Sequence, residues 1–78
     1  MSARMTPYRH VGEPSGVVAY RIMAKAIDVK FVDGRTYTYT YASTGESAVE
    51  QMKQLAKAGA GLSTFISQHV RDNYASRH

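Results

Sequence analysis

The alternation of apolar and polar residues between positions 17 and 32 predicts two antiparallel β-strands joined by a short turn. Residues 17–23 read "VVAYRIM", and the apolar side of this strand carries Val18, Tyr20 and Ile22. Residues 26–32 read "AIDVKFV", and the apolar side of this strand carries Ile27, Val29 and Phe31. Each strand therefore has one face suited to a hydrophobic core.

A third strand is predicted in "GRTYTYTYAST", where Tyr37, Tyr39 and Tyr41 alternate with threonines after the turn signal Asp33-Gly34. The loop length decides which face carries the tyrosines, because a one-residue change in register moves every side chain to the other face. A two-residue loop would place the threonines beside the apolar residues of the second strand. A three-residue loop that starts at Val32 would place the tyrosines there instead. Local turn chemistry permits both, but burying three threonine hydroxyls is costly, which favours the three-residue loop.

Beyond residue 45 the spacing of apolar residues changes to that of a helix. Ser47, followed three residues later by Glu50, has the form of a capping box, and Gly59 is a natural C-terminal cap. The apolar side of this predicted helix carries Ala48, Val49, Met52, Leu55, Ala56 and Ala58. Its polar side carries Glu50, Gln51, Lys53, Gln54 and Lys57. A second predicted helix has one apolar stripe of Leu62, Phe65, Ile66, Val70 and Tyr74.

The order of elements predicts an α+β domain over residues 17–78, in which a three-stranded antiparallel sheet packs against two C-terminal helices in two layers (β-β-β-α-α). Residues 1–16 contain both prolines and little periodicity, and we expect them to form a flexible N-terminal arm. With the tyrosines facing the helices, the other face of the sheet is polar. We call it the polar face, and it consists of Arg21, Asp28, Lys30, Thr36, Thr38 and Thr40.

The amino-acid composition excludes several classes of function and favours others. The 78 residues contain no cysteine, which excludes disulfides, thiolate zinc sites and cysteine catalysis and fits a reducing compartment. No stretch approaches the roughly 20 apolar residues of a membrane helix, and residues 1–16 contain no signal-peptide core, so a cytoplasmic protein without membrane contact is expected. Ten Lys and Arg against six Asp and Glu give a net charge of +4, which favours polyanionic partners.

No motif in the sequence specifies an enzyme, a metal site or a cofactor. His10, His69 and His78 are too far apart for a local metal motif. Catalysis would require a pocket lined by His69, Asp72 and a tyrosine, and a two-layer domain of this size offers little concavity. We therefore expect a non-enzymatic protein without catalytic residues, metal or cofactor.

The order of elements and several local patterns resemble the KTSC family, a small domain named after the C-terminal extension of some lysyl-tRNA synthetases. The resemblance is carried by "IDVKF", Gly34, the Tyr37-Thr38-Tyr39 triplet and the closing helix with Phe65-Ile66, Val70 and Tyr74. It covers about residues 15 to 75. The chain departs from the family in "YASTGES", where the family usually has a valine-proline pair, and in having only Ser15 where the family has a double serine. The family has no established biochemistry, and its attachment to a synthetase implies an association with RNA.

Two binding functions follow as hypotheses. The first is an RNA-binding or nucleic-acid-binding module in which Arg21, Lys30, Arg35, Lys53 and Lys57 contact phosphates. Tyr41, at the end of the tyrosine strand, is the ring most open to a base in this hypothesis. The second is a protein-interaction module or homo-oligomer that uses the edge of the sheet or its polar face.

Overall fold

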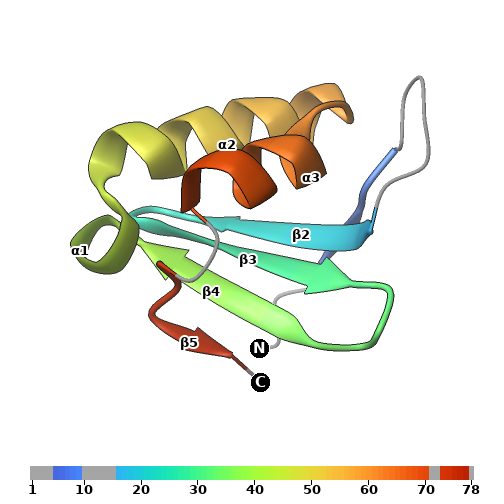
Figure 1. The fold of residues 1–78 in the computed structure, drawn as a ribbon. Coiled ribbons are helices and arrows are strands. Elements are labelled where there is room, and N and C mark those ends of the chain that lie inside the picture. Colours follow the sequence, from blue (N-terminus) through green and yellow to red (C-terminus); the bar gives the residue numbers. More distant parts are fainter. Residues whose placement is uncertain (1–4, 10–15, 71–72, 78) are drawn as a thin grey trace.

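A computed structural model describes residues 5–9, 16–70 and 73–77 (Figure 1). Its centre is a five-stranded antiparallel sheet in the order β1-β2-β3-β4-β5. The strands are β1 (Thr6–Pro7), β2 (Val17–Met23), β3 (Ala26–Phe31), β4 (Thr36–Thr40) and β5 (Ser76–Arg77). The three central strands are those expected from the alternating pattern, and each sheet edge is a two-residue strand.

Helices α2, α3 and η1 pack on one face of the sheet, while the opposite face carries none of these three (Figure 1). The helices are α1 (Tyr41–Thr44), α2 (Glu46–Ala58), α3 (Leu62–Phe65) and the π-helix η1 (Ile66–Val70). The two-layer α+β class is thus confirmed, with α2 as one main helix and α3 with η1 as the other. In the described parts of the chain, every helix is too short or too polar to cross a membrane.

The segment before β2 differs from the expected flexible arm. Thr6 and Pro7 pair with Tyr20 and Ala19, which extends the sheet by one strand. Tyr8 is buried, and its hydroxyl accepts a hydrogen bond from the amide of Leu62 at 3.2 Å. Within residues 5–9 the arm is therefore a structural element, and a strand of two residues is too short to produce a readable alternation.

The β3–β4 turn is the three-residue loop favoured by the burial argument. Val29 pairs with Tyr37, and the amide of Gly34 donates to the carbonyl of Phe31 at 2.9 Å. Gly34 has a φ of 90°, a conformation that side chains with a Cβ rarely adopt. The tyrosines of β4 consequently share the face of Ile27 and Val29.

The core lies between this face and the helices. Tyr39 is only 1% exposed, and Tyr37 is half-buried beside it. A register shift between Val17 and Ala19 places Val17 in the core in place of Val18, the residue expected from strict alternation. The buried apolar residues are Tyr8, Val17, Ile27, Val29, Tyr39, Val49, Met52, Ala56, Leu62, Ile66 and Val70.

The start of α2 differs from the predicted capping box at Ser47 and Glu50. The helix begins at Glu46, its N-cap is Gly45 with a φ of 103°, and no side chain caps it. A capping box is present one element earlier, where Thr40 and Ser43 bond to each other's backbone around α1. The predicted C-terminal cap is confirmed, since Gly59 is left-handed and its amide donates to the carbonyls of Leu55 and Ala56.

Candidate functional site

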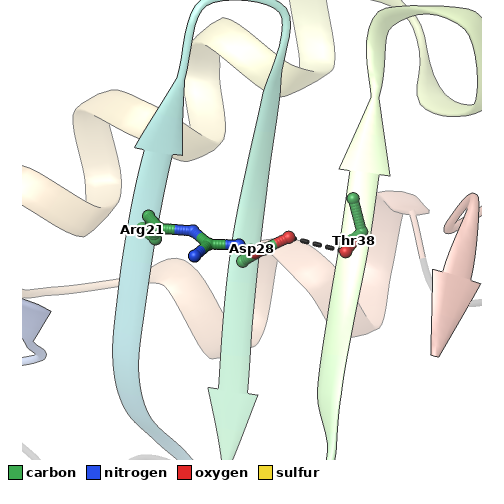
Figure 2. Close-up of polar contacts among 3 residues, drawn as sticks. All are labelled: Arg21, Asp28 and Thr38. Carbon is green, nitrogen blue, oxygen red and sulfur yellow. Dashed lines mark hydrogen bonds and ion pairs between the residues drawn. The ribbon is translucent and has the colours of Figure 1, made fainter. Parts of the chain in front are cut away.

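A row of three side chains crosses the polar face of the sheet. The register places Arg21 on β2 opposite Asp28 on β3, and Asp28 opposite Thr38 on β4. The Thr38 hydroxyl donates to Asp28 Oδ1 at 2.6 Å, and the Arg21 guanidinium donates to Asp28 Oδ2 (Figure 2). One carboxylate therefore connects three strands.

Asp28 is buried although it lies on the face without the main helices. Its side chain is 3% exposed, while that of Arg21 is 34% exposed. A buried carboxylate is stable only when its charge is compensated and its oxygens accept hydrogen bonds, and here each oxygen has a donor. The charge of Asp28 is thus hidden from the surface and compensated by Arg21.

The rest of the polar face presents a cation and hydroxyl groups to solvent. Lys30 is exposed and pairs with Thr36 across the β3–β4 ladder. Thr36 and Thr40 are half-buried at the two ends of β4. Among the residues of β2, β3 and β4 on this face, Asp28 is the one acidic residue, so the accessible charge of the face is positive.

Lys53 lies on α2, in the helical layer on the other side of the sheet from the polar face. Its surroundings differ from the solvent-exposed position expected for a phosphate-binding residue. It is 6% exposed, and its ammonium donates to the carbonyl of Ala24 at 3.1 Å. The ammonium also pairs with Glu50 at 2.8 Å and lies 5.5 Å from the centre of the Tyr41 ring. Lys53 therefore joins α2 to the β2–β3 turn, and its charge is directed into the fold.

Tyr41 completes this cluster, since its hydroxyl donates to Glu50 Oε2. The hydrogen bond to Glu50 raises the pKa of Tyr41 to about 12, because ionisation of the phenol would remove the donor beside a carboxylate. The hydrogen bonds from Lys53 and then from Tyr41 lower the pKa of Glu50. Tyr41 lies in α1, whereas the sequence suggested the end of the tyrosine strand.

The six residues predicted to contact nucleic acid do not form one surface. Arg21 and Lys30 lie on the polar face, whereas Arg35 is exposed at the end of the β3–β4 loop, opposite Phe31 and in alternation with Tyr37 and Tyr39 of the other face. The others, Tyr41, Lys53 and Lys57, belong to the helices. Of the five cations, Lys30, Arg35 and Lys57 are exposed.

Sequence reasoning missed the row of Arg21, Asp28 and Thr38. Met23 pairs with Ala26, so the β2–β3 turn has two residues and places Arg21 opposite Asp28. The three-residue β3–β4 loop then places Asp28 opposite Thr38. The sequence contained a turn signal for the second loop, at Asp33-Gly34, but none for the first, so only the pairing of Asp28 with Thr38 could have been found from it.

The residues considered for catalysis or metal binding are not assembled in the described structure. His69 is exposed on η1 and packs against Phe65, with ring centres 4.7 Å apart. Asp72, His10 and His78 lie outside the described residues. Among residues 5–9, 16–70 and 73–77, no three His, Asp or Glu side chains lie close enough together to hold a metal ion.

Comparison with known proteins gives no further assignment. No protein-family model, no curated protein and no solved structure matches the chain.

Proposed function

We propose that the protein is a small, non-enzymatic binding module that contacts the phosphate backbone of nucleic acid through its polar face. The observation that carries this proposal is that the Asp28 carboxylate is buried. Because the Asp28 carboxylate is buried against Arg21, the face offers Lys30 and threonine hydroxyls to a polyanion without an exposed acidic residue among its members. The net charge of +4 favours the same class of partner.

RNA is the nucleic acid we favour. The support comes from the resemblance to the KTSC family in the Tyr37-Thr38-Tyr39 triplet and the closing helix, since that family is attached to a tRNA synthetase. The residues that carry the resemblance lie in β3, β4, α3 and η1, except Gly34 in the β3–β4 loop and Tyr74, which follows the end of η1. RNA binding through the polar face is our extension of that resemblance.

Binding of this kind would position a nucleic-acid backbone without reading its bases. Lys30 would contact a phosphate through charge, and the hydroxyl of Thr36 would donate to a phosphate oxygen. Base stacking on Tyr37 and Tyr39 is not part of the proposal, because these rings lie on the other face of the sheet, between it and the helices.

A salt titration of binding to a mixed-sequence single-stranded RNA tests the proposal. Affinity should fall steeply between about 50 and about 200 mM salt, because each phosphate contact releases a counterion. Lys30→Ala should weaken binding and reduce the slope of log K against log salt by about 0.7. Lys57→Ala is the matched control, since Lys57 is an exposed lysine on α2, away from the polar face.

Two results would overturn the proposal. The first is the absence of binding even at low salt. The second is an equal loss of affinity in Lys30→Ala and Lys57→Ala, which would indicate attraction by net charge without a defined face.

Self-association through a sheet edge is the second candidate function. Within the described residues, the two-residue strand β1 pairs with only Ala19 and Tyr20 of the seven-residue strand β2, and the amide of Tyr8 bonds to the carbonyl of Val18. An edge paired over so short a length can pair with another strand. Light scattering should then detect a dimer at high protein concentration, and a monomer at every concentration would count against this candidate.

A further inference from the structure

A cavity of about 370 Å³ lies between the β3–β4 hairpin and the start of η1. Its walls include the aromatic rings of Phe31, Tyr37 and Tyr39 from the sheet and the side chain of Ile66 from η1. This volume is within the range of about 300 to 1,000 Å³ that is typical of small-molecule sites. The cavity is on the helix side of the sheet and is therefore separate from the polar face.

The aromatic walls are held at fixed angles. The rings of Phe31 and Tyr37 are 5.3 Å apart and inclined at 76°, so one presents an edge where the other presents a face. Tyr74 packs edge-to-face against Tyr37 at 4.8 Å and against Tyr39 at 6.3 Å. Planar aromatic molecules pack favourably against such a combination of edges and faces.

The polar groups of the cavity are at the hairpin and at the first turn of η1. Asp33 Oδ1 accepts a hydrogen bond from the amide of Arg35 at 2.9 Å, and within the described residues Asp33 Oδ2 has no hydrogen-bond donor. Ser67, which is exposed, contributes a hydroxyl. Ile66 and Ser67 both belong to a π-helical turn, a conformation that occurs frequently at functional sites.

Charges of both signs lie near the aromatic walls. Asp33 carries a carboxylate at the hairpin, and Arg77 on β5 bonds to the side chain of Tyr37 and attracts that carboxylate. The two opposite charges largely offset each other for a charged ligand, which would still lose its hydration on entering the cavity. An uncharged ligand avoids that cost and can donate a hydrogen bond to the carboxylate.

We propose that this cavity binds a small, uncharged, planar aromatic molecule that donates one N–H or O–H hydrogen bond to Asp33. The inference does not depend on nucleic-acid binding, because it uses a different face and different residues. Indole is a suitable probe, since it is planar, uncharged and has a single N–H donor.

The test is a titration of the ¹⁵N-labelled protein with indole, followed by NMR. Saturable shifts are expected at the amides of Val32, Asp33 and Ser67, which lie around the cavity. Indole-3-acetate and tryptamine should bind more weakly than indole, because each carries a charge that must be desolvated beside a pair of charges that already offset each other. Shifts that do not saturate, or shifts spread over the whole surface, would overturn the proposal.

Three variants test the site directly, two within it and one as a control. Ser67→Trp should fill the cavity and abolish the indole shifts, whereas Gln68→Trp adds the same ring at the next exposed position of η1 and should leave them intact. Asp33→Asn keeps an oxygen for the Arg35 amide but removes the charge. It should weaken indole binding and bring the dissociation constants of indole and indole-3-acetate closer together. Unchanged binding in both Ser67→Trp and Asp33→Asn would place indole elsewhere and refute the site.

Discussion

Arg21 and Asp28 face each other across β2 and β3, and their ion pair lies on the sheet face that α2, α3 and η1 leave uncovered. The pair is asymmetric, because the carboxylate is almost inaccessible to water whereas about a third of the guanidinium side chain is exposed. Removal of Arg21 and removal of Asp28 should therefore change the free energy of unfolding by different amounts. Loss of Arg21 would leave a buried charge uncompensated, and loss of Asp28 would leave a partly solvated one.

We expect Asp28→Ala to lower the free energy of unfolding by about 2 kcal/mol, less than for a fully buried pair because Arg21 is partly exposed. Arg21→Ala should cost more than Asp28→Ala, since it leaves the carboxylate buried. Urea denaturation measures both values. Lys30→Ala, on the same face, is the control and should change stability by no more than about 0.5 kcal/mol. Equal effects of all three substitutions would show that the row does not stabilise the sheet.

Gly34→Ala tests the turn that sets the tyrosine register. A Cβ at position 34 would meet no atom within 4 Å, so the cost arises from the φ of 90° alone. We expect a loss of about 1 to 2 kcal/mol in urea denaturation. Gly16→Ala is the matched control, because its Cβ would lie at an ordinary contact distance of 3.7 Å from Phe31 Cδ2. A loss of stability in the control that equals the loss in Gly34→Ala would contradict the explanation.

The sequence was sufficient to predict the register of β4 because the two possible loops buried chemically different side chains. One loop placed tyrosines beside Val29, and the other placed threonines there, so the cost of desolvation distinguished them. The same reasoning could not locate the start of α2. Ser47 and Glu50 had the spacing of a capping box, but the chain enters the helix at Glu46 through Gly45, so Ser47 is already helical.

The environment of Lys53 could not be predicted from its helix position. Helical spacing assigned it to the polar side of α2, but α1 and the β2–β3 turn lie against that side. The aliphatic part of a lysine can be buried when its ammonium has partners, and these partners are distant in sequence. Ala24 is 29 positions from Lys53, a contact that only the assembled fold reveals.

Lys53→Met should lower stability by about 1 kcal/mol, because the Ala24 carbonyl loses its donor while most of the buried stem is kept. It should also change the acid dependence of stability. The pKa of Glu50 is lowered in the fold, so its carboxylate contributes stability above pH 4.5, and the contribution is lost as the pH falls further. That loss should be smaller in Lys53→Met. Lys30→Met, at an exposed position on the polar face, should retain the acid dependence of the unmodified protein in denaturation at several pH values.

Tyr41 should make the stability of the fold decrease as the pH rises into the alkaline range, the reverse of the effect of Glu50. Its pKa is raised from 10.0 to about 12, so the fold favours the protonated phenol. The resulting stabilisation is fully present below pH 10 and is lost as the pH rises toward 12. NMR of ¹³C-labelled tyrosine, with Tyr41→Phe to assign the signal, should show this ring titrating late. Glu50→Ala should return the pKa toward its ordinary value, and a wild-type Tyr41 that titrates near pH 10 would contradict the arrangement.

The hydrogen bond between the Tyr8 hydroxyl and the Leu62 amide spans 54 positions of the chain. Bringing together two residues this distant in sequence carries an entropic cost, and folding is slower when such non-local contacts are numerous. During synthesis from the amino end, the Tyr8 ring could be buried only after Leu62 has left the ribosome. The completion of the core is therefore tied to the synthesis of α3, and a nascent chain halted before α3 would expose an incomplete apolar surface.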